Sequence, residues 1–330
     1  MSVKDKFKKN PSIYYAMSIA ATWAGVGSLM NGITMAQDYG IIPFIIWAIG
    51  NTLACVVFGI FTPMIPRLRD IMQSKVMHFT LGVMSVFQIW LSMNGIQAAF
   101  ADTVAGGRLG MWLAYGIAAF FLLLLLRFGM IRNVLTDGAS WIAVYGVATL
   151  LTVCAIIYSG GNMVHLPMGA EPANIAVGID KALLLVPGAF LYPYFFEILD
   201  YNDKNDDGTH GVNIRRAFCI GGLMFGIYLL FTFLLAWTNY SPVLNIVKAV
   251  LITLIGTSTL SSFLYSVYLT FGRKAGLAIN LAAVAGWQFL IPLGVMGVWT
   301  LMAQIRIYIV AAVIIAAIVW HCVSGKAVKS

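Results

Sequence analysis

Hydroxyl and carboxyl side chains occur inside two long apolar stretches of this chain. The first stretch, 243–270, carries four hydroxyl residues close together: Ser258, Thr259, Ser261 and Ser262. On a helix, residues three and four positions apart share a face, so hydroxyls at this spacing lie side by side. The second stretch, 135–158, carries Asp137 near its start. Hydroxyl and carboxylate oxygens are ligands that hard cations such as Na⁺ prefer, so these residues are candidate ion ligands.

Each of these residue types also has an ordinary structural use. Ser and Thr in membrane helices often bond their own backbone or a neighbouring helix. An acid at a helix N-terminus can act as a cap, and Asp137 follows a basic connector. An ionisable group inside an apolar helix is costly without a partner, which favours a functional role for Asp137. Both alternatives stay open from the residues alone.

Glu197 is a second acid close to an apolar run, and three interpretations of it remain open. It can bind a cationic group, carry a coupling proton, or pair with a basic loop residue such as Arg215. We therefore treat Glu197 as a possible coupling acid.

The composition places these residues in a membrane. Of the 330 residues, 61% are hydrophobic and 10% are charged, and the mean hydropathy is +0.89. A soluble domain of this size needs far more polar surface. A helix of about 20 apolar residues crosses a bilayer, and ten runs of suitable length are present: 14–36, 41–64, 78–101, 110–126, 135–158, 180–198, 216–238, 243–270, 277–300 and 305–323.

The ten runs form two sets of five, over 14–158 and 180–323, within a single transmembrane domain that spans 1–330. An odd number of helices in each half inverts the second half relative to the first, a known transporter plan. The first run contains Gly25-Val26-Gly27-Ser28, and the sixth contains Pro187-Gly188 and Pro193. We predict an all-α membrane protein with ten helices in a 5+5 inverted repeat, in which helices one and six are discontinuous. Close helix packing is the alternative use of these small residues.

Charge placement predicts the orientation of the chain. With the N-terminus inside, sixteen of the 20 Lys and Arg residues lie in inner segments, as expected for a cytoplasmic side. Four remain on or near the outer side: Arg108, Lys181, Lys248 and Arg306. We predict a multi-pass protein of the cytoplasmic (inner) membrane with both termini cytoplasmic. The net charge of +8 follows from this asymmetry and needs no nucleic-acid partner.

Three segments resemble the solute:sodium symporter family, of the LeuT-type fold in the APC superfamily. Residues 128–137, FGMIRNVLTD, resemble the family's signature of a glycine followed further on by Thr-Asp. Residues 256–262, GTSTLSS, look like its small-residue and Ser-Thr sodium motif, and residues 20–28, AATWAGVGS, are similar in character to its first helix. Members usually carry further helices, so this chain resembles a family core reduced to ten helices.

The resemblance implies a sodium site and a transport activity. It implies that Ser258 and Thr259 supply side-chain oxygens to Na⁺, that Ala20 and Trp23 supply backbone carbonyls, and that Asp137 lies just inside the ion. The implied activity is sodium-coupled symport of a small organic solute by alternating access.

By the same analogy the solute lies between the broken helices one and six, facing helices three and eight. The candidate lining residues are Gly25, Gly27, Ser28, Gln88, Asn94, Gln97, Tyr192, Tyr194 and Phe195. The amides can equally join helices, and the aromatic residues can equally be a packed cluster. No Lys or Arg is expected in mid-membrane to pair with a carboxylate. The N–H groups at the glycine-rich break suit one nevertheless, which favours an amino acid or another small organic solute.

Several other functions are disfavoured or remain as alternatives. No nucleophile, base and orienting group converge at a defensible spacing, so an enzyme is not expected. The four Cys and four His residues are scattered, so no metal cluster is expected. The alternatives to sodium symport are a proton-coupled or uncoupled transporter of the same fold and a non-transporting membrane sensor or assembly protein. The sequence leaves the oligomeric state open.

Overall fold

The computed structural model describes residues 11–64, 75–101, 103, 106–125, 130–192, 194–199, 213–295, 297–306, 308–309 and 312. Within these residues the chain is almost entirely helical and contains no strand. The helices are α2 (Pro11–Trp23), α3 (Val26–Thr34), η1 (Met35–Tyr39), α4 (Ile41–Met64), α6 (Lys75–Ala99), α7 (Gly106–Leu125), α8 (Met130–Ser159), α9 (Pro172–Phe190), α11 (Ile214–Ala236), α12 (Pro242–Phe271), α13 (Arg273–Gly286) and η2 (Trp287–Leu293). Residues 194–199 and 297–306 are also helical.

Eight helices in the described part are long and apolar enough to cross a membrane, judged by length and composition. Large apolar side chains are exposed on their outer faces, among them Leu123, Ile142 and Ile157. Such a surface is unfavourable in water and suits lipid tails. These features agree with the prediction of a multi-pass helical membrane protein.

The predicted ninth span, 277–300, is not one continuous helix. Helix α13 ends at Gly286, and the 3₁₀ helix η2 follows it and contains Pro292. Gly294 then adopts a φ of +63°, a left-handed conformation that favours glycine. Proline lacks an N–H donor and a residue with a positive φ interrupts a helix, which accounts for the irregular geometry. The predicted span corresponds to Arg273–Leu293, which is long and apolar enough to cross a membrane. Most of the predicted tenth span, 305–323, lies outside the described residues.

The predicted interruption of the first helix is confirmed. Helix α2 ends at Trp23 and α3 begins at Val26. Gly25 lies between them with an extended backbone, φ −45° and ψ 160°. The chain therefore leaves the helix for two residues, at the start of the glycine-rich stretch.

The sixth predicted helix is also interrupted, but later than Pro187-Gly188. Helix α9 continues through these two residues and ends at Phe190, and the chain is helical again from 194 to 199. Pro193 lies outside the described residues. Tyr192 and Tyr194 therefore lie on either side of the interruption.

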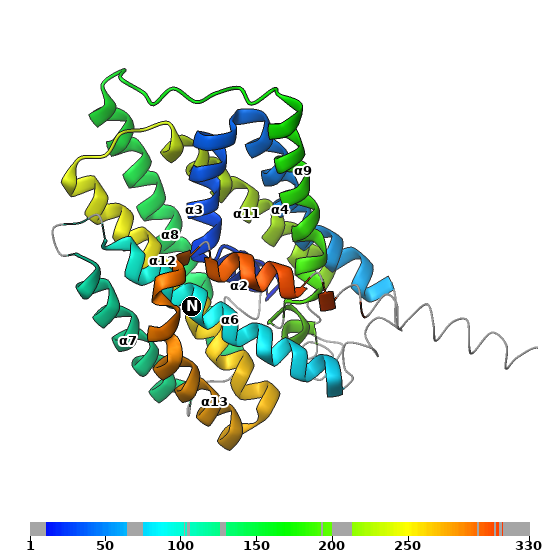
Figure 1. Ribbon diagram of the computed structural model, residues 1–330. Coiled ribbons are helices and arrows are strands. Elements are labelled where there is room, and N and C mark those ends of the chain that lie inside the picture. The colour runs from blue at the N-terminus through cyan, green and yellow to red at the C-terminus, as the bar shows by residue number, and fades with distance from the viewer. Residues whose placement is uncertain are drawn as a thin grey trace, which may run out of the picture.

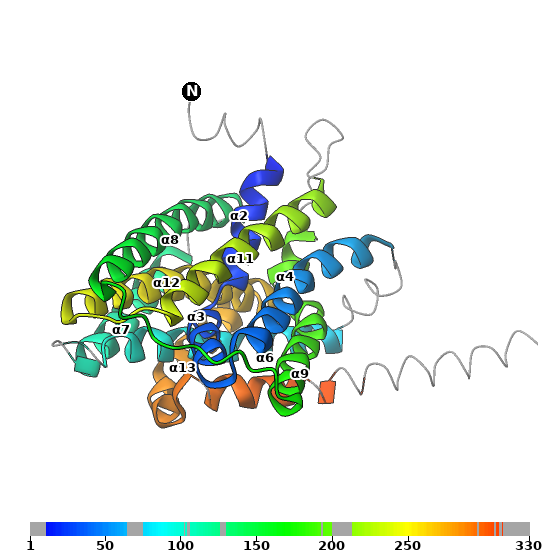
Figure 2. The same ribbon diagram turned by 90° about the horizontal axis from the view of Figure 1, so that it is seen from above.

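The helices pack in pairs around α3. Helix α12 packs along α6, α4 along α9, and α11 along both α2 and α4. Viewed from above, α8 and α12 lie on one side of α3, and α4 and α9 lie on the other (Figure 2). A Cβ atom at Gly95 would lie 2.0 Å from a methyl group of Val26. Helix α6 therefore approaches α3 so closely at this point that only glycine fits.

One end of the bundle is crossed by the connector between α8 and α9. Residues 160–171 run over the ends of α3 and α4 (Figure 1). The connector is held by backbone hydrogen bonds from Ile41 N to the Pro167 carbonyl, 2.9 Å, and from Ile42 N to the Met168 carbonyl, 3.1 Å. This segment is therefore fixed to the start of α4.

Candidate functional site: a buried aspartate and an adjacent cavity

Asp137 lies inside α8 and is completely buried. Helix α8 begins at Met130, so Asp137 is about two turns from its start. An N-cap residue lies immediately before the first helical residue. The capping alternative is therefore wrong, and the carboxylate needs another explanation.

The Asp137 carboxylate accepts hydrogen bonds from side chains of several segments. Its Oδ2 atom accepts from Ser18 Oγ at 2.7 Å and from Tyr194 OH at 3.1 Å. Its Oδ1 atom accepts from Ser258 Oγ at 3.0 Å. Ser262 Oγ lies 3.2 Å from Oδ2, and Asn133 Nδ2 lies 3.3 Å from the same oxygen. We call these residues the Asp137 cluster: Ser18, Asn133, Asp137, Tyr194, Ser258 and Ser262.

The Asp137 cluster joins four parts of the fold. Ser18 comes from α2, Asn133 and Asp137 from α8, Tyr194 from the segment 194–199, and the two serines from α12. All six residues are buried. Within the described part of the chain, no Lys, Arg or His forms an ion pair with Asp137. A buried carboxylate stabilised only by neutral donors still lacks a compensating charge.

The structure brings part of the predicted sodium site together. Ser258 contacts Asp137 directly. The Thr259 hydroxyl instead donates to the Ile255 carbonyl of its own helix, 2.9 Å away. The Ala20 carbonyl accepts the Ala24 N–H at 2.9 Å, and the Trp23 indole donates to Asn51 Oδ1 at 3.0 Å. The ligand roles of Ala20, Trp23 and Thr259 stay predictions of the resemblance.

Sequence reasoning missed three members of the cluster as ion-site candidates: Ser18, Asn133 and Tyr194, the last of which it assigned to the solute. Asn133 precedes Asp137 by four residues on the same helix, a spacing that places both on one face. Ser262 belongs to the hydroxyl group already noted on α12, four residues after Ser258. Ser18 carries no such local signal, because it meets α8 only through the packing of α2 against it.

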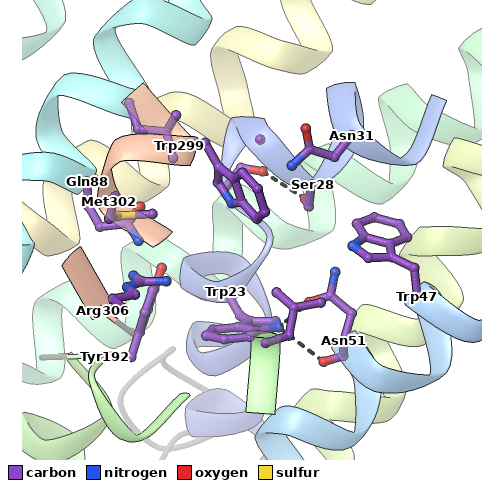
Figure 3. A pocket seen from close by; sticks show the side chains of 14 residues that line it. Trp23, Ser28, Asn31, Trp47, Asn51, Gln88, Tyr192, Trp299, Met302 and Arg306 are labelled. Carbon is purple, nitrogen blue, oxygen red and sulfur yellow. Dashed lines mark hydrogen bonds between the residues drawn. The ribbon is translucent and has the colours of Figure 1, made fainter. Parts of the chain in front are cut away.

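A cavity of about 60 Å³ lies beside the interruption of the first helix (Figure 3). By the usual volume of a bound water, it has room for several waters or a small solute. It is lined by Trp23, Gly25, Gly27, Ser28, Asn31, Trp47, Asn51, Gln88, Leu91, Leu185, Tyr192, Trp299, Met302 and Arg306. Five of the predicted solute-binding residues are among them: Gly25, Gly27, Ser28, Gln88 and Tyr192.

The other predicted solute-binding residues lie elsewhere. Asn94 accepts from the Trp287 indole at 2.7 Å and donates to the Gly294 carbonyl at 3.1 Å, so it ties α6 to η2. Tyr194 belongs to the Asp137 cluster. Phe195 is completely buried among aromatic rings, with Trp23 at 5.5 Å between centroids. Gln97, on α6, is not among the cavity-lining residues.

Arg306 lies at the wall of the cavity, which charge counting alone does not reveal. Sequence reasoning put it on or near the outer side, yet its guanidinium lines the cavity between the interrupted helices. Its Nε and Nη2 atoms are buried and have no hydrogen-bond partner among the described residues. Packing carries the segment 297–306 to the cavity wall. The expectation that no Lys or Arg lies in mid-membrane concerns depth in the bilayer and stays a prediction.

A short chain of hydrogen bonds connects the cavity to the Asp137 cluster. The Tyr192 hydroxyl, at the cavity wall, donates to the Thr22 carbonyl at 2.5 Å. The Thr22 hydroxyl lies 3.3 Å from the Ser262 hydroxyl. The last turn of α2 thus contacts both places.

Comparison with solved structures gives a distant likeness. No protein-family model matches the chain, and no curated protein matches it. A crystal structure of a manganese transporter from Eremococcus coleocola, in complex with an aromatic bis-isothiourea substituted compound, is similar at a TM-score of 0.42. The two chains are 15% identical, and the likeness covers 97% of this chain and 73% of that one. This likeness is too distant to assign a fold family or a substrate.

Glu197 and the cysteines belong neither to the Asp137 cluster nor to the residues that line the cavity. Glu197 is half-buried on the segment 194–199, and its predicted coupling role stays a prediction. Cys55, Cys154 and Cys219 are free thiols. Among the described residues, no three His, Cys, Asp or Glu side chains gather in a way that could hold a metal ion.

Proposed function

We propose that this protein is a secondary active transporter that carries a small organic solute together with Na⁺ by alternating access. The observation that supports the proposal is the Asp137 cluster, a buried carboxylate surrounded by hydroxyls and without a described cationic partner. Binding a cation supplies the missing charge, and the hydroxyl oxygens can turn their lone pairs to it.

The ligand set that we propose combines the resemblance with the geometry. Asp137 and Ser258 belong to both, and Ser18 and Ser262 are added because their hydroxyls lie within 3.2 Å of the carboxylate. The solute would occupy the cavity beside Gly25, where the interrupted helices leave backbone groups exposed. The ten-helix 5+5 arrangement of the LeuT type belongs to the same proposal.

A proton is the alternative coupling ion, favoured by the same observation. Protonation neutralises a buried carboxylate as effectively as a bound cation does. In that case transport follows the pH gradient, and Na⁺ has no effect on binding or flux.

Thermal unfolding of the purified protein in NaCl and in KCl, at equal ionic strength, tests the sodium site. We expect a higher melting temperature in Na⁺, because an ion that binds only the folded state stabilises it. Ser258→Ala and Ser262→Ala should each weaken this difference. Ser261→Ala is the matched control, since the Ser261 hydroxyl donates to the Ser258 carbonyl, 2.8 Å away. Equal melting temperatures in the two salts for the unmodified protein would contradict sodium coupling.

A further inference from the structure

Among the described residues that line the cavity, one is charged, and its charge is positive. Of the lining residues only Arg306 is ionised, and no Asp or Glu is among them. Lys181 adds a second positive charge nearby, with Nζ 4.6 Å from the centroid of the Trp299 ring. Trp299 itself lines the cavity. The field inside the cavity therefore favours an anion.

The guanidinium of Arg306 has unused donors. Nε and Nη2 are both buried without a hydrogen-bond partner in the described part of the chain. A buried donor that finds no acceptor costs free energy, and a charged donor costs more. Nε and one Nη atom form the planar fork that binds a carboxylate through two parallel hydrogen bonds.

The remaining walls limit the kind of anion. Trp23, Trp47 and Trp299 supply aromatic surface, and Leu91 and Met302 supply apolar surface. With a single guanidinium, a monoanion is neutralised, whereas a doubly charged phosphate would keep an uncompensated charge in this setting. The small volume, about 60 Å³, restricts the body of the solute to a few heavy atoms.

The wall opposite Arg306 offers an acceptor. Asn31 Oδ1 is buried and has no hydrogen-bond partner among the described residues. Figure 3 shows Asn31 on one side of the cavity and Arg306, Gln88 and Tyr192 on the other. A solute that spans the cavity thus meets donors at one end and an acceptor at the other.

We propose that the transported solute is a small carboxylate with a hydrogen-bond donor at its far end, such as a small amino or hydroxy acid. Arg306 binds its carboxylate, and Asn31 accepts from its amino or hydroxyl group. That this solute is transported rests on the proposed function. That it binds here rests on the cavity alone.

Matched pairs of acids and amides test, without any mutation, whether the solute needs a carboxylate in order to bind. Melting temperatures of the purified protein are measured with L-alanine, L-lactate, alaninamide, lactamide and inorganic phosphate, at constant NaCl. We expect at least one acid to stabilise the protein and its amide to bind on the order of tenfold to a hundredfold more weakly. Stabilisation by an amide as strong as by its acid, by phosphate alone, or by none of the five compounds would overturn the proposal.

Variants of Arg306 test whether the acid stabilises the protein by binding in the cavity. Arg306→Gln should abolish the stabilisation by the acid, and Arg306→Lys should retain part of it, because a lysine keeps the charge but lacks the fork. Arg108→Gln is the matched control, since Arg108 is exposed at the start of α7. An unchanged response of Arg306→Gln to the acid would contradict the assignment.

Melting temperatures with and without Na⁺, together with uptake into proteoliposomes, separate this inference from the proposed function. A Na⁺-dependent rise in melting temperature without any solute concerns the Asp137 cluster alone. If Na⁺ stabilises the protein but neutral solutes are taken up into proteoliposomes as well as acids, the carboxylate proposal fails and sodium coupling stands. If acids bind through Arg306 but Na⁺ has no effect, sodium coupling fails and the carboxylate site stands.

Discussion

Trp287 and Asn94 join two elements through one buried hydrogen bond. The indole Nε1 donates to Asn94 Oδ1 at 2.7 Å, and both side chains are buried. Trp287→Phe keeps most of the aromatic volume but leaves this oxygen without its donor. We expect a loss of about 1–3 kcal/mol of stability, the usual cost of a buried unsatisfied group.

Melting temperatures in detergent measure this loss. Trp112→Phe is the control, because the Trp112 side chain is 68% exposed on α7. A drop of the same size in both variants would show that the indole hydrogen bond is not the cause.

At the residue scale, sequence patterns found the two residues with strong local signals. Asp137 and Ser258 stand out because a charged or polar group in an apolar helix needs a partner. Ser18 and Tyr194 reach the carboxylate only through the packing of distant segments. The place of Arg306 in the cavity wall was not foreseen, because charge counting assigns a side of the membrane and cannot detect a cavity formed by tertiary contacts.

At the scale of elements, small residues set how closely helices approach. A Cβ atom at Gly50 of α4 would lie 2.5 Å from the Ala182 Cβ and 2.8 Å from its Cα in α9. Gly50→Ala therefore forces α4 and α9 apart, and we expect a cost of about 1–3 kcal/mol from overpacking.

Gly116→Ala is the matched substitution for this test. No neighbour lies within 4 Å of a Cβ atom at Gly116, on α7. Alanine favours a helix over glycine by up to about 1 kcal/mol, so this variant should melt no lower than the unmodified protein. Equal destabilisation of the two variants would rule out the close approach of α4 and α9 as the cause.

Hydropathy predicted the positions of the helices to within a few residues. The positions of the interruptions were harder to predict. The glycines at 25 and 27 marked a real break, whereas Pro187-Gly188 lies within α9. The break at Gly294 was missed, since glycine and proline occur in intact membrane helices too. Which of them interrupts a helix depends on backbone partners that the surrounding helices supply.

For the whole molecule, the orientation in the membrane remains a prediction from the Lys and Arg distribution. It places the connector 160–171 outside and both termini inside. Met168 is 60% exposed on this connector, which makes it a suitable reporter position.

Cysteine labelling in intact cells checks this orientation. In a background without the four native cysteines, Met168→Cys should react with a membrane-impermeant maleimide added outside. Lys329→Cys should react only after the membrane is permeabilised. The opposite pattern would invert the predicted topology.

The hydrogen bonds around the last turn of α2 have a thermodynamic consequence. Tyr192 touches this turn from the cavity, and Ser262 touches it from the Asp137 cluster. If occupation of one place changes the affinity of the other, the coupling free energy is the same in both directions. If Na⁺ raises the affinity for the solute tenfold, the coupling free energy is about 1.4 kcal/mol. The solute must then raise the affinity for Na⁺ tenfold as well.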